Sequence, residues 1–280
     1  LTQREHCVFT PSGSSAIQLA LIVSDIGVGD EVICPNMSYV ASANQIMLFG
    51  ATPVFVDVDK FGHIDVEQIE DRISNKTRAI MPVGLYGDNF DYDRVKTLAD
   101  KYNLIIIEDA AQSYGSHYKT IPAGKLGDIS IVSFARNKPT ATPFGGGALL
   151  TDDAVIAQRA QLASVHGKQG RYGEIQELGI NAQQAEDRAL AVFLSMQRSE
   201  DKRYLREIIV RSYMKACDQA GIEYRTARLG STTNYHKFCM FVDDQESVIS
   251  KFAENSISVD KYYQENFEHS MLGSFKFNKM

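Results

Sequence analysis

The sequence predicts an α/β fold: a three-layer sandwich with a mostly parallel central sheet, followed by a smaller C-terminal α+β domain. Two observations lead to this prediction. Short, continuous apolar runs recur through the first half of the chain, and amphipathic helical patterns separate them. Strands that are apolar on both faces are typical of parallel sheets covered by helices, and strand–helix alternation is typical of α/β domains. We place the large domain at 1–203 and the smaller one at 204–280.

The apolar runs predict strands at 31–35, 53–58, 79–83, 104–109 and 129–134. The amphipathic patterns between them predict helices at 14–25, 38–49, 66–73 and 91–102. From about residue 153 the chain turns helical, with long stretches at 153–164 and 182–220, and a short strand at 236–244 and a helix near 246–254 follow. Ligands of open α/β sheets bind at the carboxyl ends of the strands, so residues that follow strands are the candidates for a site.

Composition excludes several classes of function. The 280 residues carry a net charge of -6, and no segment clusters Lys and Arg as a nucleic-acid surface would. No apolar run approaches the roughly 18 residues of a membrane span. The first residues, LTQREHCVFTPSG, carry charge where a signal peptide would be apolar. We therefore expect a cytoplasmic protein that binds neither nucleic acid nor membrane.

The potential metal ligands are scattered. The four cysteines form no CxxC pair and are interpreted as reduced thiols; they are Cys7, Cys34, Cys217 and Cys239. The six histidines show no metal-ligand spacing, and His166 in SVHG is interpreted as a packed or loop residue. We predict no metal site.

A phosphate site is predicted in the segment TPSGSSAIQLAL, residues 10–21. Its glycine and serines directly precede an apolar run of helical period. Free N–H groups at a helix start, with serine hydroxyls beside them, suit an anion such as phosphate. Ser-Gly-Ser before a helix is also an ordinary helix cap, so the motif alone leaves both interpretations open.

Asp109 ends the strand expected at 104–109, after three isoleucines and Glu108. A carboxylate held in a partly dry site can preserve the protonated state of a cation that faces it. Gln112, three residues on, can supply an amide to the same ligand. A structural aspartate that caps the next turn is the other interpretation.

Lys138 lies in a Ser-, Thr- and Gly-rich loop, SFARNKPTATPFGGGALL at 133–150, between two expected strands. Most lysines are simply solvated, whereas a nucleophilic lysine must be partly desolvated or close to another cation. A loop packed across strand ends provides that setting. Together the phosphate site, Asp109 and Lys138 match what pyridoxal phosphate needs: a phosphate anchor, a carboxylate for the pyridinium nitrogen and a lysine for the aldehyde.

A series of motifs occurs in one fixed order along nearly the whole chain: SGSSAIQLAL, GVGDEVICPNMSYVASANQIMLFGATPVFVDVD, VGLYG, IIEDAAQSYGS, GDISIVSFARNK, GGGALLTDD, VHG and LGIN. In this order the chain resembles the sugar aminotransferases of the DegT/DnrJ/EryC1/StrS family, in the fold-type I, aspartate aminotransferase-like superfamily. The resemblance is specific because many spaced motifs occur together.

The resemblance implies roles for four residues around the cofactor ring. Lys138, five residues after Ser133, matches the lysine that forms the Schiff base. Asp109 matches the partner of the pyridine nitrogen, and Gln112 matches a residue that hydrogen-bonds near the ring hydroxyl. Tyr39, in MSYVAS, matches the aromatic residue that stacks on the ring.

The resemblance also implies the phosphate ligands. Ser14, Ser15 and Ser133 match ligands from the same chain. Asn181, in LGIN, matches an asparagine that reaches the phosphate from the neighbouring subunit. The chain is therefore expected to form a homodimer with shared sites.

The implied reaction is amino transfer in two halves. An amino acid, glutamate in most family members, donates the amino group, and a keto sugar attached to a nucleotide receives it. Lys138 shuttles the proton, while Asp109 keeps the ring protonated as the electron sink. Relatives that catalyse dehydration carry a histidine in place of the lysine, so Lys138 favours amino transfer.

Three features depart from the family pattern. Phe144 occupies the place of the glutamate in Gly-Glu-Gly-Gly, and Gln183 occupies the place of an arginine two positions after Asn181. The region after residues 256–270 is expected to be shorter than in the family. The two substitutions bear on substrate identity, and the third feature bears on the small domain.

Two other functions stay open. Phe144 and Gln183 motivate the alternative of a degenerate homologue that acts as a binding or regulatory subunit. A Rossmann dehydrogenase fits less well, because GGGALL follows a loop and enters a strand pattern, the reverse of the dinucleotide fingerprint.

Overall fold

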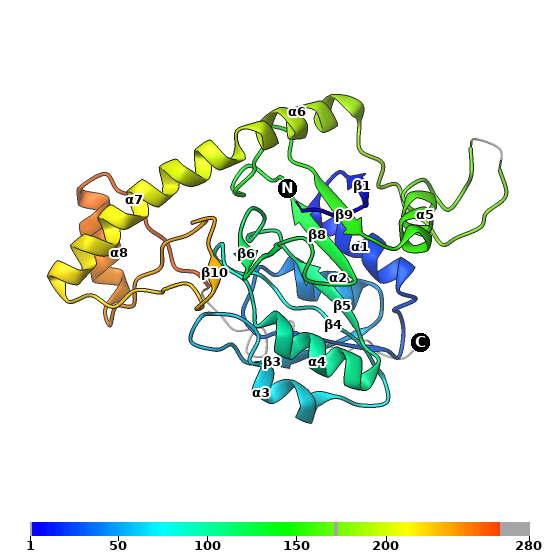
Figure 1. Cartoon of the computed structure of the whole chain (residues 1–280), viewed down its shortest axis with the longest axis horizontal. Coiled ribbons are helices and arrows are strands. Elements are labelled where there is room, and N and C mark those ends of the chain that lie inside the picture. The colour runs from blue at the N-terminus through cyan, green and yellow to red at the C-terminus, as the bar shows by residue number, and fades with distance from the viewer. Residues whose placement is uncertain (1, 171–172, 264–280) are drawn as a thin grey trace.

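The computed structural model describes residues 2–170 and 173–263. Its centre is a seven-stranded sheet with the order β1–β9–β8–β5–β4–β2–β3 (Figure 1). The strands are β1 (His6–Thr10), β2 (Glu31–Pro35), β3 (Thr52–Val56), β4 (Thr77–Ile80), β5 (Ile105–Asp109), β8 (Ile129–Ser133) and β9 (Gly147–Thr151). Strand β9 is antiparallel to both of its neighbours, and the other adjacent pairs are parallel. The expected mostly parallel sheet is confirmed.

Helices cover both faces of this sheet. One face carries α1 (Gly13–Val23), α2 (Ala41–Leu48) and α5 (Ala154–Ala163), and the other carries α3 (Val66–Ile69), the 3-10 turn η1 (Glu70–Arg72) and α4 (Tyr92–Tyr102). Strand β2 shows why two layers form: Val32 and Cys34 pack into the cluster with α1, and Ile33 packs into the cluster with α4. Because successive side chains alternate between faces, a continuous apolar run buries both.

The five predicted strands all form, with ends displaced by a few residues. The pattern indicated a strand after the glycine run, where β9 forms, but it did not predict β1 or the small sheet of β6 (His117–Tyr118), β7 (Ile121–Pro122) and β10 (Ser231–Thr232). Strand β1 alternates exposed and partly buried side chains at the sheet edge, and the three strands of the small sheet, each of two residues, are too short to stand out. Antiparallel pairing at one edge of the sheet was therefore missed.

The C-terminal part is helical at α6 (Glu186–Gln197), α7 (Ser199–Ala220) and α8 (Gln245–Glu254), and α7 extends away from the sheet (Figure 1). The strand predicted at 236–244 is wrong. Only Met240 makes an isolated bridge, to Tyr224, because the adjacent segment pairs over too few residues to form a ladder. The predicted domain boundary at 203/204 falls inside α7, and the division into domains stays a prediction.

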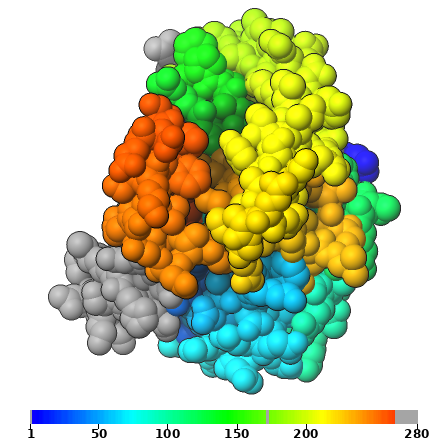
Figure 2. Space-filling model, turned by 90° about the vertical axis from the view of Figure 1, so that its left-hand side faces the viewer, coloured from blue at the N-terminus to red at the C-terminus, as the bar shows by residue number. Residues whose placement is uncertain are grey.

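Residues 225–237 tie this part to the sheet. Arg225 forms an ion pair of 3.3 Å with Asp88, whose side chain is fully buried. The backbone N–H of Arg228 donates to the same carboxylate at 2.9 Å, and its guanidinium contacts Asp59. Figure 2 shows the outer face of this region, with α7 in yellow and α8 in orange-red above the cyan segment that includes α3. Among the described residues, no helix combines the length and apolarity that a membrane crossing requires.

Candidate active site

The candidate site lies where neighbouring parallel strands end. Asp109 is the last residue of β5, Ser133 is the last residue of β8, and the two strands are hydrogen-bonded to each other. The turn that follows β5 carries Gln112, and the loop that follows β8 carries Lys138. The carboxyl edge of the sheet thus brings together residues that are widely spaced in the chain, as expected for an α/β fold.

Asp109 is buried and held by two donors. Its side chain is 5% exposed. The Ser42 hydroxyl donates to Oδ2 at 2.8 Å, and the Ala111 backbone N–H donates to Oδ1 at 3.0 Å. Burial raises the pKa of Asp109 above its ordinary value, although these two bonds and the charge of Lys138 oppose the rise. The carboxylate is therefore short of positive charge, which a cationic ligand would supply.

Lys138 is partly buried beside an aromatic ring. Its Nζ lies 5.4 Å from the ring centroid of Tyr39, a cation–π distance. Burial lowers the pKa of the Lys138 amine; the charge of Asp109 opposes this shift, and the charge of Lys237 adds to it. The amine is therefore closer to its neutral, nucleophilic form than a surface lysine is.

Gln112 and Tyr39 differ in how they are held. The Gln112 side chain is 3% exposed, and its Oε1 accepts from the Tyr86 backbone N–H at 3.2 Å while its Nε2 donates to the Tyr263 hydroxyl at 2.9 Å. Tyr39 precedes α2, and its side chain is 56% exposed. One face of the site is thus an oriented amide, and another is an open aromatic ring beside Lys138.

The start of α1 forms an anion cradle next to Ser133. Ser12 is the N-cap: its Oγ accepts from the Ser15 backbone N–H at 3.1 Å and lies 3.0 Å from the Ser15 hydroxyl. In the described chain no hydrogen bond occupies the Ser14 hydroxyl. A Cβ on Gly13 would lie 2.9 Å from the Cβ of Ser133, so glycine permits the close approach of β8. Capping and anion binding are therefore compatible here, since the cap leaves Ser14 available.

Among the described residues, the Asn181 side chain makes no hydrogen bond to this group. This side chain is exposed, and the backbone of Asn181 forms an isolated bridge with Val165, just after α5. The other seven predicted site residues gather around the ends of β5 and β8 and the start of α1.

Sequence reasoning missed several residues at this site. Ser42, which donates to Asp109, lies three residues after Tyr39 in a helical pattern, and this spacing on one helix face was the available signal. His236 had no comparable signal, because it arrives from the C-terminal part. Burial, with the charges of Lys138, Lys237 and Arg206, lowers the pKa of His236 to about 3, so this imidazole is neutral at physiological pH.

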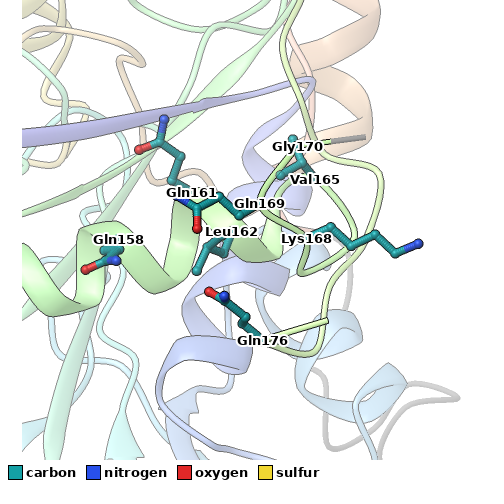
Figure 3. Close-up of a pocket in the computed structure, with 8 residues that line it drawn as sticks. All are labelled: Gln158, Gln161, Leu162, Val165, Lys168, Gln169, Gly170 and Gln176. Atoms are coloured by element: carbon teal, nitrogen blue, oxygen red, sulfur yellow. The ribbon is translucent and has the colours of Figure 1, made fainter. Parts of the chain in front are cut away.

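A separate cavity of about 390 Å³ lies beside α5 (Figure 3). Most of its lining side chains are amides and aliphatic groups, and the residues are Gln158, Gln161, Leu162, Val165, Lys168, Gln169, Gly170 and Gln176. None of the predicted site residues lines it. Lys168 is the one charged side chain among these lining residues, and none of them is an acid. The cavity therefore lacks the carboxylate that the Asp109–Lys138 site provides.

Comparison with known proteins agrees with this geometry. The model of the DegT/DnrJ/EryC1/StrS aminotransferase family matches residues 1–275. The chain belongs to this family. The predicted resemblance, the fold class and the assignment as an aminotransferase are confirmed.

Three relatives show how far the similarity extends within the DegT/DnrJ/EryC1/StrS family. UDP-2-acetamido-2-deoxy-3-oxo-D-glucuronate aminotransferase of Pseudomonas aeruginosa is 31% identical over 260 residues, 92% of this chain and 72% of its own length. dTDP-3-amino-3,6-dideoxy-alpha-D-galactopyranose transaminase of Aneurinibacillus thermoaerophilus is 33% identical over 260 residues, 92% of this chain and 71% of its own. The crystal structure of S. venezuelae DesV in complex with a ketimine intermediate has a TM-score of 0.93 and 29% identity, and the match covers 98% of this chain and 74% of DesV.

Proposed function

We propose that this protein is a pyridoxal-phosphate-dependent aminotransferase that moves an amino group from an amino acid, with glutamate as the first donor to test, to a nucleotide-linked keto-deoxysugar. The observation that supports this most is that the buried carboxylate of Asp109 and the partly buried amine of Lys138 lie near enough at one sheet edge for the charge of each to shift the pKa of the other. The nucleotide-linked sugars in the names of the two curated relatives support the substrate class.

The residues present fit pyridoxal phosphate. Asp109 is a buried carboxylate without enough positive charge around it, which suits a protonated ring nitrogen. The exposed ring of Tyr39 offers a stacking face beside Lys138. Ser14, at the start of α1, and Ser133 offer hydroxyls and a helix N-terminus to a phosphate. When bound, the cofactor supplies an electron sink for the carbon that loses its proton.

The chain's own residues supply proton transfer and orientation. Lys138 holds and moves the proton, because burial lowers the pKa of its amine and so makes its neutral, basic form easier to reach than that of a surface lysine. Asp109 keeps a positive charge at the ring nitrogen. Gln112 is oriented from both ends by Tyr86 and Tyr263, so its amide has a defined direction. Every residue that the resemblance assigns to the cofactor is present, which favours amino transfer over a binding or regulatory subunit.

We further propose a cytoplasmic homodimer with shared sites. Asn181 supports the dimer, because its side chain is exposed and makes no hydrogen bond to the other predicted site residues within the described chain. The four cysteines form no disulfide, which supports a reducing compartment.

The direct test is borohydride reduction of the cofactor-loaded protein, followed by peptide mapping. We expect a pyridoxyl group on Lys138, and Lys138→Ala should lose both this adduct and amino transfer while keeping the fold. Lys168→Ala is the matched control, because Lys168 is also partly buried but lines the cavity beside α5. An adduct on a different lysine would refute the assignment.

A further inference from the structure

The loop that carries Lys138 is held from outside by the helices that follow it in the chain. Arg206 of α7 donates from Nη1 to the carbonyl of Pro139, the residue after Lys138, at 3.2 Å. Ser195 of α6 donates from Oγ to the carbonyl of Ala141 at 2.8 Å. The position of this loop therefore depends on side chains far along the sequence.

The guanidinium of Arg206 also hydrogen-bonds to a second segment of the chain. Arg206 donates from Nε to the carbonyl of Asn234 at 2.9 Å. Asn234 is 1% exposed, and its side-chain amide donates to the carbonyls of Gln112 and Tyr114 at 2.7 and 2.9 Å. Its backbone N–H donates to Gly87 at 2.9 Å. Contacts thus run without a break from the Lys138 loop, through Arg206 and Asn234, to the turn that carries Gln112.

Two features show that this arrangement is specific. A Cβ on Gly87 would lie 2.3 Å from Oδ1 of Asn234, so only glycine admits the asparagine. Arg206 contacts backbone carbonyls, and no carboxylate pairs with it among the ion pairs of the described residues. A planar guanidinium can serve two carbonyls in fixed directions, which the single ammonium of lysine does less well.

We propose that Arg206 and Asn234 form a positioning clamp, through which the C-terminal part of the chain fixes the Lys138 loop against the Gln112 turn. Neither residue touches the reacting atoms. Their importance for catalysis rests on the proposed function, because Lys138 and Gln112 matter to the reaction only if they act on the cofactor. A displacement of about 1 Å at a reacting group can cost about a hundredfold in rate, so the clamp controls the reactivity of Lys138.

The clamp is tested first in the cofactor-free full chain, by amide hydrogen exchange of peptides covering 135–146 and 110–116. Arg206→Gln should accelerate exchange in both peptides by roughly tenfold, the effect of losing a hydrogen bond to a charged group. Arg211→Gln is the control on the same helix, because Arg211 is exposed and, among the described residues, its ion pair and side-chain hydrogen bonds all go to Glu207. Unchanged exchange in either peptide of Arg206→Gln would overturn the clamp.

A second variant asks whether the two residues act as one unit. Asn234→Asp keeps the size of the side chain but replaces the donors to Gln112 and Tyr114 with an acceptor. We expect Asn234→Asp to accelerate exchange in both peptides. In the double variant Arg206→Gln/Asn234→Asp, the exchange rates should be little higher than those of the faster-exchanging single variant. Fully additive effects would show two independent contacts and contradict a clamp.

The cofactor-loaded enzyme separates this proposal from the proposed function. Arg206→Gln should lower kcat and shift the pH midpoint of the visible absorption band, with KM for the amino donor little changed. If borohydride mapping of the wild type leaves Lys138 unmodified, the proposed function fails, and the exchange measurement still decides whether the clamp exists. If mapping succeeds and Arg206→Gln behaves like Arg211→Gln, only the clamp fails.

Discussion

Asp109 illustrates how burial can prepare a side chain for a charged partner. The end of β5 places the carboxylate out of water, and only Ser42, Ala111 and the nearby Lys138 favour its ionised form. The balance raises the pKa of Asp109, so the cofactor-free fold favours the neutral side chain more than water does. A protonated ring nitrogen would reverse that preference, and the carboxylate would then hold the nitrogen's proton in place.

This balance predicts opposite effects of Asp109→Asn on stability and on turnover. Because the pKa of Asp109 is raised, its contribution to stability is present below its ordinary pKa and is lost as pH rises through the folded-state value. Asn stays neutral, so the free energy of unfolding of the cofactor-free variant at pH 7 should equal or exceed that of the wild type. Turnover should fall by at least about a hundredfold. Urea unfolding and a transamination assay measure the two effects, and near-normal turnover would make Asp109 structural only.

At the scale of elements, the segment between Asn181 and α6 packs under the glycine-rich loop. A Cβ on Gly146 would lie 2.9 Å from Nε2 of Gln184, which places these two residues in close approach. Phe144, with 58% of its side chain exposed, lies two residues before Gly146, and Gln183 adjoins Gln184. The two substitutions that depart from the family pattern therefore flank one contact.

Gln184 itself is predicted to destabilise the fold. Both polar atoms of its amide are buried and have no hydrogen-bond partner within the described residues. An apolar side chain of similar length removes that desolvation cost, so Gln184→Met should raise the free energy of unfolding by about 1–3 kcal/mol. Gln183→Met, at an exposed position, is the control and should change it by less than about 0.5 kcal/mol. If Gln184→Met instead lowered the free energy of unfolding, the Gln184 amide would have a hydrogen-bond partner in solution.

At the scale of the whole molecule, stability depends on imidazoles that the fold keeps neutral. Burial, joined by the charges of Lys138, Lys237 and Arg206, lowers the pKa of His236 to about 3. Below pH 6.5 the unfolded chain therefore binds a proton that the folded chain does not. Stability from this residue is fully present above pH 6.5 and is lost as the pH falls.

A comparison with His236→Gln isolates this effect from the buried carboxyls. Asp88, Glu108 and Asp109 have pKa values raised by burial, so they act in the opposite direction as the pH falls. From pH 7 to pH 5.5 the wild type should lose about 1 kcal/mol more than His236→Gln. Urea unfolding at both pH values gives the difference. If the free energy of unfolding changed equally with pH in the wild type and in His236→Gln, His236 would be protonated as readily in the folded chain as in the unfolded chain.

The proposed shared site predicts complementation between subunits. Lys138→Ala and Asn181→Ala homodimers should each be impaired, since one lacks the amine and the other lacks the amide that reaches the neighbouring phosphate. In a mixed dimer one of the two sites is wholly wild type, so about a quarter of the wild-type activity should return after random subunit exchange, by the counting of symmetric pairs. Exchange confirmed by sedimentation or mass spectrometry without recovered activity would mean that each chain completes its own site.

Local pattern was enough to predict much of this protein. Continuous apolar runs predicted the five parallel strands, because burial on both faces requires an apolar side chain at each position of a strand. Asp109, at a strand end, and Lys138, in the loop that follows a strand, stood out because polar groups there follow buried sequence. The order of the motifs was enough to identify the family.

The contacts that orient these groups were decided only by the tertiary structure. Ser42 donates to Asp109, Gly13 admits Ser133, and Arg206 reaches the carbonyl beside Lys138. The strand predicted at 236–244 failed because a strand needs a neighbour along its length, and its apolar pattern cannot supply one. Periodicity in the sequence records which side of an element is buried; it does not record which distant segment arrives there, because that depends on how the whole chain closes around its core.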